Sequence, residues 1–119
     1  MELGFTPLHY ASYHGNPKMI EILIDAGADM YAENNQGINM LHVAAQGDSV
    51  YSVAFFLKKS FIGINSVDKS KSTPLHWACI SHSHAVVRYL VAWHADVKKI
   101  DLAGYTPLHL ALRDLELDP

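Results

Sequence analysis

The apolar residues of this chain fall in short runs that recur in pairs along its length. In the first pair, Leu8 and Ala11 share one face at helical spacing, and residues 20–24 are apolar nearly all round. A Thr-Pro dipeptide at 6–7 and an Asn-Pro dipeptide at 16–17 precede the two runs. Thr and Asn cap helices well, and Pro suits the first helical position. The pattern therefore predicts two short helices, of which the second is buried on more than one side.

One tetrapeptide marks the start of each pair. Thr-Pro-Leu-His occurs at 6–9, 73–76 and 106–109, and a degraded copy, Asn-Met-Leu-His, stands at 39–42. Successive copies are 33, 34 and 33 residues apart, and one extra residue within Ser60–Gly63 accounts for the longer interval. A period of this length is typical of an array of small helical units rather than of one globular fold.

The turn that precedes each motif has its own pattern. Glycine stands there in three units, at 4, 37 and 104, whereas Lys71 takes its place in the third unit, so we expect a different turn geometry there. His94 stands where the first unit has Gly27. Histidine is enriched at positive φ, so this helix end should keep the left-handed conformation.

The pattern begins directly with a repeat and stops after Arg113. Terminal repeats of solenoids have polar outer faces, whereas Leu108, Leu110 and Leu112 have no second helix to cover them. We therefore interpret the chain as a segment of a longer protein without proper end caps. We also expect self-association through the open repeat ends.

The composition fits a cytoplasmic module. The 119 residues are 50% hydrophobic, yet no stretch approaches the roughly 18 consecutive apolar residues of a membrane span. Residues 1–3 do not resemble the start of a signal peptide, so we expect no insertion into a membrane by these residues. A single cysteine excludes an intramolecular disulfide, and a net charge of −3 argues against nucleic acid as the main partner.

The Thr-Pro-Leu-His-x-Ala motif at this period resembles the ankyrin repeat over the whole chain, and Gly27-Ala28-Asp29 stands where such a unit ends. The resemblance implies an all-α solenoid of helix pairs with projecting β-turn fingers. It also implies a concave surface that binds other proteins and has no catalytic activity. The implied arrangement is one domain, 1–119, of about three and a half repeats. Their approximate limits are 4–36, 37–70, 71–103 and 104–119.

A narrower resemblance rests on residues 40–48 and 72–79, which are similar to the N-terminal ankyrin region of DHHC-type protein S-palmitoyltransferases. In that family, cytosolic repeats recruit substrate proteins to a membrane acyltransferase. The Asp-His-His-Cys motif and its zinc-binding cysteines do not occur in this sequence, so no catalytic residue can be carried over. The alternatives are a free-standing scaffold and an inhibitory adaptor, which need the same surface.

The histidines and Cys79 are the only candidates for chemistry. The motif histidines at 9, 42, 76 and 109 occupy one position in successive units. Stacked helices lie about 8–10 Å apart, whereas each ligand of a zinc ion must approach to about 2 Å. We therefore interpret them as structural residues that bond the turn backbone and the neighbouring repeat. We expect a solvated loop at His82-Ser83-His84, a packed Cys79, and no metal or cofactor site.

Candidate binding residues follow from the ankyrin resemblance, in which finger residues and the last residues of the first helix face the partner. These residues are Leu3, Phe5, Tyr13, His14, Gln36, Ile38, Gln46, Ser72, Ile80, Ser81, Leu102, Tyr105 and Arg113. Those in an apolar and aromatic stripe are Phe5, Tyr13, Ile38, Ile80 and Tyr105. Trp77 is either a packing residue between repeats or a partly exposed anchor. Lys58-Lys59 and Lys98-Lys99 suit a solvated face better than a membrane surface.

Overall fold

The computed structural model describes residues 4–116, with side chains through residue 113. The described residues contain seven helices and no strand, so the predicted all-α solenoid is confirmed. The helices are α1 (Pro7–His14), α2 (Pro17–Asp25), α3 (Met40–Gln46), α4 (Val50–Lys59), α5 (Pro74–Ile80), α6 (His84–Ala92) and α7 (Pro107–Glu116).

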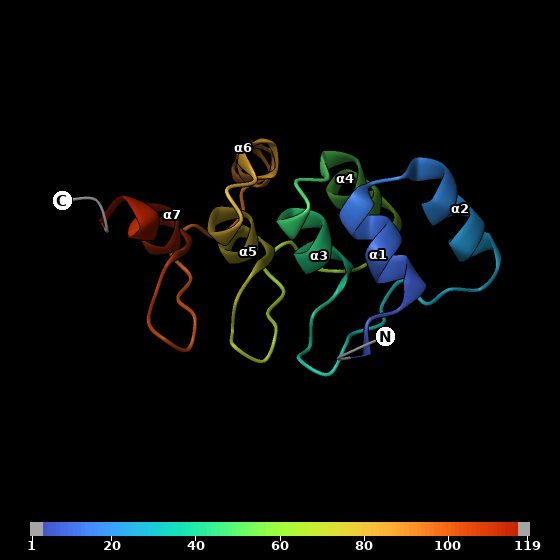
Figure 1. The fold of residues 1–119 in the computed structure, drawn as a ribbon, viewed down its shortest axis with the longest axis horizontal. Coiled ribbons are helices and arrows are strands. Elements are labelled where there is room, and N and C mark those ends of the chain that lie inside the picture. The colour runs from blue at the N-terminus through green and yellow to red at the C-terminus, as the bar shows by residue number, and fades with distance from the viewer. Residues whose placement is uncertain (1–3, 117–119) are drawn as a thin grey trace.

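The helices form two layers. The inner helices α1, α3, α5 and α7 pack against one another in chain order, and α2, α4 and α6 each pack on the inner helix of their own repeat. In α2 only Ile20 is buried and Ile22 is 50% exposed, so the expectation that this helix is buried on more than one side is wrong. In Figure 1 the loops between successive repeats project as fingers from one edge of this stack. We call the face that the inner helices share with the fingers the concave side, because the ankyrin resemblance implies a concave surface there.

The buried core repeats with the motif. Leu8, Leu41 and Leu75 occupy one position in the inner helices, and none is more than 3% exposed. Leu108, at the same position in α7, is 64% exposed, and Leu112 is also exposed. Leu110 is buried, so the expectation that all three leucines of α7 lie uncovered is wrong at this position. It joins the core through the contact between α5 and α7.

Each motif histidine caps its own helix. The backbone N–H of Thr6 donates to Nδ1 of His9 over 3.0 Å, and the Thr6 hydroxyl accepts from the His9 backbone N–H. This is a capping box with histidine at the third helical position. Asn39 and Thr73 form the same box with the histidines that follow them.

The same imidazoles join neighbouring repeats. Nε2 of His9 lies 3.0 Å from the carbonyl oxygen of Ile38, His42 lies 3.0 Å from that of Ser72, and His76 lies 2.9 Å from that of Tyr105. Because Nδ1 accepts a backbone N–H, the proton of each neutral ring must sit on Nε2, which donates to the carbonyl. We call these three bonds the histidine ladder. They confirm the structural role predicted for the motif histidines.

Each finger closes around one side chain at its base. The side-chain oxygen Oδ1 of Asn34 accepts two backbone N–H groups, from residues 36 and 38, at 3.0 and 2.9 Å. Asp68 and Asp101 do the same in the next two fingers. Backbone bonds then link adjacent fingers, from the N–H of Lys69 to the Gln36 carbonyl and from that of Leu102 to the Ser70 carbonyl. The fingers therefore form one connected edge.

Two turn expectations have different outcomes. His94 has φ +65°, so the predicted left-handed helix end is confirmed. Lys71 has φ +59°, close to the +74° of Gly37 and the +85° of Gly104, so the expected change of turn geometry is wrong. The hydrogen bonds at the base of the finger hold Lys71 in the conformation that glycine adopts elsewhere.

We expect the Lys71→Gly variant to be more stable than the natural chain. A side chain in the left-handed region costs on the order of 1 kcal/mol, which glycine avoids. The free energy of unfolding, measured with urea, should rise by about 0.5–1 kcal/mol. Lys69→Gly is the matched control, since Lys69 is not at positive φ and its replacement should not stabilise the fold. Equal effects of the two changes would contradict the assignment of strain to Lys71.

We also expect the chain to lose stability on acidification. Burial lowers the pKa of His9 and His42 below the usual value of 6.5, an effect that nearby Asp68 partly offsets for His42. The unfolded chain therefore binds protons first as the pH falls. The contribution to stability is fully present above about pH 6.5 and is lost as the pH falls toward the folded pKa.

Urea unfolding at a series of pH values from about 7.5 to about 5.5 measures this effect. The His42→Gln variant should be less stable at neutral pH but should show a flatter dependence on pH. The exposed His14 provides a control, because His14→Gln should keep the full dependence. A free energy of unfolding that rises on acidification would contradict neutral ladder histidines.

Candidate protein-binding surface

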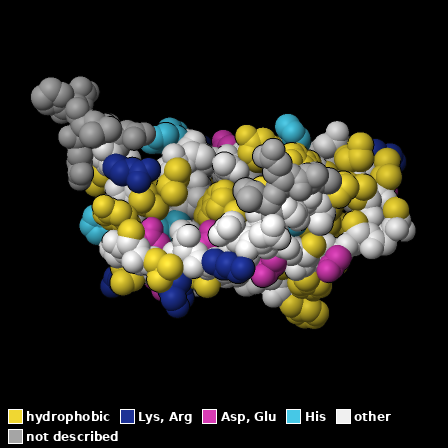
Figure 2. All heavy atoms as spheres, turned by 60° about the horizontal axis from the view of Figure 1, so that its bottom comes forward, with side chains coloured by type: hydrophobic (Ala, Val, Ile, Leu, Met, Phe, Trp, Pro, Cys, Tyr) yellow, Lys and Arg dark blue, Asp and Glu magenta, His cyan; other side chains and the backbone are white. Residues whose placement is uncertain are grey.

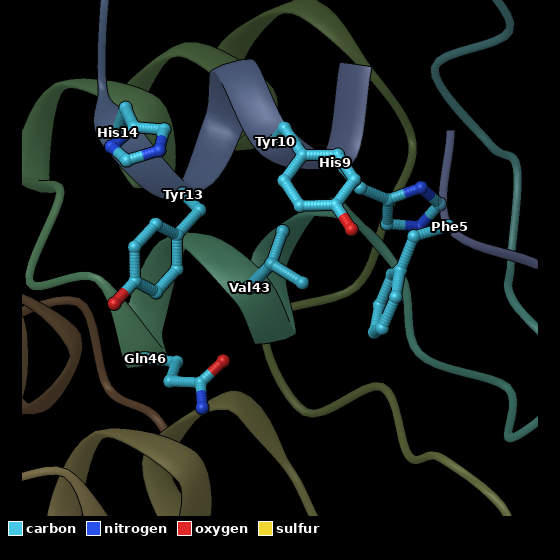
Figure 3. Close-up of a pocket in the computed structure, with 7 residues that line it drawn as sticks. All are labelled: Phe5, His9, Tyr10, Tyr13, His14, Val43 and Gln46. Atoms are coloured by element: carbon cyan, nitrogen blue, oxygen red, sulfur yellow. The ribbon is translucent and has the colours of Figure 1, made fainter. Parts of the chain in front are cut away.

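A hollow opens on the concave side between α1 and α3. It encloses about 230 Å³, and its lining comes from the first finger turn, α1 and α3. Figure 3 shows Tyr10 and Tyr13 projecting from α1 toward α3, with Val43 between them. The lining residues are Phe5, His9, Tyr10, Tyr13, His14, Val43 and Gln46. Aromatic and apolar surface thus predominates, and the exposed polar residues His14 and Gln46 lie on the side of Tyr13 (Figure 3).

Ring contacts fix the aromatic wall of this hollow. The Phe5 ring lies edge-on to His9, at 5.3 Å between centroids, and to Tyr10 at 6.3 Å. Tyr13 makes a similar contact with His14 at 5.1 Å. Such edge-to-face pairs are favourable, so the wall is held before any partner arrives.

Next to this hollow, the end of α1 and the end of α3 approach each other closely. The hydroxyl of Ser49 donates to the carbonyl oxygen of Tyr13. A Cβ atom at Gly47 would clash with that same carbonyl oxygen. Glycine at 47 therefore allows the end of α3 to reach the backbone beneath Tyr13.

The structure brings together four of the predicted binding residues, namely Phe5, Tyr13, His14 and Gln46. Tyr13 is 39% exposed, and His14 and Gln46 are also exposed. The prediction for Leu3 lies outside the described residues. The hollow also uses Tyr10 and Val43, which stand at the position of Trp77 in the first two repeats.

Two predicted members of the surface are buried. Ile38 is 6% exposed and Ser72 is 9% exposed, so the expectation of an exposed Ile38 in an apolar stripe is wrong. Both residues lie in the segment that leads from a finger to the next helix. The backbone carbonyl of each accepts a hydrogen bond from a histidine of the ladder. Their position beneath the fingers explains why the side chains are covered.

Trp77 combines packing with partial exposure. Its Nε1–H donates to Oδ2 of Asp68 over 3.0 Å, and its ring lies 5.8 Å from that of His42. The ring is half-buried between the second and third repeats. Packing is therefore its main role, and one side of the ring stays accessible.

The interface between the first and second repeats has no counterpart of the hydrogen bond between Trp77 and Asp68. Val43 stands at the position of Trp77 one repeat earlier, and Asn34 stands at that of Asp68. Nδ2 of Asn34 is buried, and no residue that the structure describes accepts from it. The sequence signal for these finger-base residues is the spacing of Asn34, Asp68 and Asp101, which our sequence interpretation missed.

The remaining predicted residues lie outside the hollow. Ser81 is half-buried, and its hydroxyl donates to the Trp77 carbonyl. The others are exposed at separate places on the fingers and inner helices. These are Gln36, Ile80, Leu102, Tyr105 and Arg113.

Few groups on this surface are suited to chemistry. Burial raises the pKa of the Cys79 thiol, which keeps it protonated and a poor nucleophile. Among residues 4–113, no three His, Cys, Asp or Glu side chains gather in a way that could hold a metal ion. Across the described helices, none is long and apolar enough to cross a membrane. The aromatic and apolar lining of the hollow is suited to contact with another molecule.

Comparison with known proteins supports this interpretation. The family model for ankyrin repeats in three copies matches residues 1–68 and 41–118. The chain is 35% identical to Palmitoyltransferase AKR1 of Lachancea kluyveri over 111 residues, which cover 91% of this chain and 15% of that relative. It is 30% identical to the Target of rapamycin complex 2 subunit AVO2 of Saccharomyces cerevisiae, over 93% of this chain and 26% of that protein.

A third relative is a protein of yet another kind. The chain is 29% identical to Inversin of Canis lupus familiaris, over 89% of this chain and 10% of that protein. It therefore spans only a small part of each of these three relatives. Ankyrin repeats indicate a role in protein–protein interaction. On the repeat motif, the helix pairs and the family match, the chain belongs to the ankyrin-repeat family.

Proposed function

We propose that this chain binds a peptide or an extended loop of another protein on its concave face, and that the hollow between α1 and α3 anchors it. The observation that carries the proposal is the lining of this hollow, in which aromatic rings lie beside exposed Gln46 and His14. An apolar side chain of the partner would occupy the hollow. Gln46 and His14 would bond polar groups of its backbone.

The fingers and inner helices on the rest of the concave side are ordered before any partner binds. The histidine ladder fixes each finger against the preceding helix, and backbone bonds join adjacent fingers. A surface fixed in advance loses little conformational entropy on binding. Exposed Ile80 and Tyr105 provide further apolar contacts along the same side.

The cellular role that we propose is recruitment of substrate proteins to a DHHC-type palmitoyltransferase, with this chain as a cytoplasmic part of that enzyme. Two relatives named Palmitoyltransferase AKR1 support it, at 35% and 36% identity. The second candidate is a scaffold without an attached enzyme. The similarity to AVO2 and Inversin favours this alternative, since neither name refers to an acyltransferase.

Sequencing the full-length message would separate these two roles. Downstream apolar spans of about 20 residues that flank an Asp-His-His-Cys segment would establish the palmitoyltransferase context. A message that encodes further repeats and no such segment would support the scaffold.

We expect Tyr13→Ala to weaken peptide binding at the hollow. A random peptide library displayed on phage is selected on the immobilised chain, and the enriched peptides are titrated by fluorescence anisotropy. Loss of an anchoring aromatic ring should raise the dissociation constant by at least about tenfold. Helical content should stay the same, because Tyr13 is 39% exposed.

Tyr51→Ala is the matched control for this change. Tyr51 is 45% exposed and lies on the outer helix α4, stacked on Phe55. Its loss should leave peptide affinity unchanged. Equal losses in the two variants, or a loss only with Tyr51→Ala, would contradict the proposed site.

A further inference from the structure

Two pairs of lysines lie where the outer helices end or in the loops after them. A hydrogen bond from the Asp96 backbone N–H to Oδ1 of Asn65 holds these two loops together. Lys58 and Lys59 complete α4, and Lys98 and Lys99 follow α6. All four are exposed, and none forms an ion pair with a residue that the structure describes. A lysine at the C-terminal end of a helix interacts favourably with the helix dipole. This interaction does not account for Lys98 and Lys99, which lie beyond the end of α6.

Two exposed aromatic residues lie in the same two segments of the chain. Phe61 is 98% exposed, and Trp93, at the end of α6, is 56% exposed. Lys58 and Trp93 line one shallow hollow between α4 and α6, together with Leu57, Ile64 and Tyr89. We call Lys58, Lys59, Phe61, Trp93, Lys98 and Lys99 the basic rim.

The backbone around Phe61 is held in a position that leaves its ring exposed. It lies in the segment that holds the extra residue of the second repeat. Its backbone N–H donates to the hydroxyl of Tyr31 over 2.9 Å, which fixes the chain at this point while the ring faces solvent. In Figure 2, hydrophobic and basic side chains lie along the lower edge of the view, with acidic side chains among them.

Positive charge is concentrated in this part of the chain. Residues 58–99 contain seven of the nine Lys and Arg residues and two of the twelve Asp and Glu residues. The first repeat has Asp25 at the position of Lys58. Asp96 is the acidic residue nearest to Lys98, and its Oδ1 accepts the Lys98 backbone N–H at 2.9 Å. The rim therefore carries a net positive charge despite the overall charge of −3.

The lysine pairs alone suit a solvated face, but together with the exposed rings of Phe61 and Trp93 they suit a lipid surface. We propose that the basic rim docks on an anionic lipid bilayer. Lysines attract the negative surface of such a bilayer, while Phe and Trp insert their rings at the level of the headgroups. A planar lipid surface accepts the protruding Phe61 without a shaped pocket. An acidic polypeptide would satisfy the lysines and would leave this ring in water.

Docking in this way leaves the concave side free. The rim belongs to the outer helices and the loops after them, whereas the peptide-binding hollow lies between the inner helices α1 and α3. The chain could therefore hold a protein partner while lying on a membrane. This inference does not depend on the proposed function, since it rests on other residues.

Cosedimentation with vesicles tests the proposal. The 119-residue chain is mixed with phosphatidylcholine vesicles that contain roughly one third phosphatidylserine, and with vesicles of phosphatidylcholine alone. Binding should require phosphatidylserine and should weaken as NaCl rises from about 0.05 M to about 0.2 M. Each lysine contributes about a fivefold increase in partitioning, so Lys58→Gln/Lys59→Gln should reduce it about 25-fold. Phe61→Ala should reduce it about tenfold.

Matched variants locate the effect. Lys69→Gln/Lys71→Gln removes the same charge from a finger and should have a much smaller effect. Ile22→Ala removes a half-exposed apolar side chain from α2 and should have none. Equal losses from the two lysine pairs would overturn the assignment to the rim. No binding to the anionic vesicles, or binding to polyglutamate in their place, would overturn docking on lipid.

Discussion

The hydrogen bond from the motif histidine to the next repeat is the interaction on which the rest of the structure depends. One imidazole accepts the N–H that starts its own helix and donates to the carbonyl that ends the next finger. Each such bond contributes about 0.5–1.5 kcal/mol net, and leaving its buried groups unpaired costs about 1–3 kcal/mol. The geometry requires a neutral ring with its proton on Nε2, and burial of His9 and His42 favours the neutral form by lowering the pKa.

The ladder positions the surface that we propose binds a partner. It fixes the height of each finger relative to the preceding inner helix, and the bonds between fingertips fix the spacing of the fingers. Within this frame, Gly47 lets α3 approach the backbone of Tyr13, so that α1 and α3 enclose an aromatic hollow. The hydrogen bonds that stack the repeats, and so stabilise the fold, therefore also order the concave side.

Structural features that depend on residues within one repeat could be predicted from the sequence. Helix caps, the helix pairs, the left-handed His94 and the role of the motif histidines all follow from local residue types and one period. These features depend on helix geometry and on the repetition of a single unit. The ankyrin resemblance, by contrast, placed Phe5, Tyr13, His14 and Gln46 on one surface, and the structure brings these four residues to one hollow.

One error arose where the outcome depends on a neighbouring repeat. Ile38 is covered because its carbonyl must reach His9 of the preceding unit. Lys71 takes a glycine-like φ because Asp68 closes the finger around it. The exposure of Phe61 could not be predicted either, since the site of the extra residue was known only to within Ser60–Gly63. Contacts between units decide the burial of Ile38. The closure of the finger around Lys71 is local instead, and its sequence signal is Asp68 and the spacing of the equivalent residues in the other fingers.

The tautomer of the ladder histidines tests this account most directly. Long-range ¹H–¹⁵N correlation spectra at neutral pH distinguish a proton on Nε2 from one on Nδ1. The account predicts that His9, His42 and His76 are neutral and carry the proton on Nε2. A proton on Nδ1, or a doubly protonated ring, would mean that the imidazole cannot accept the capping N–H. The stacking of the repeats would then need another explanation.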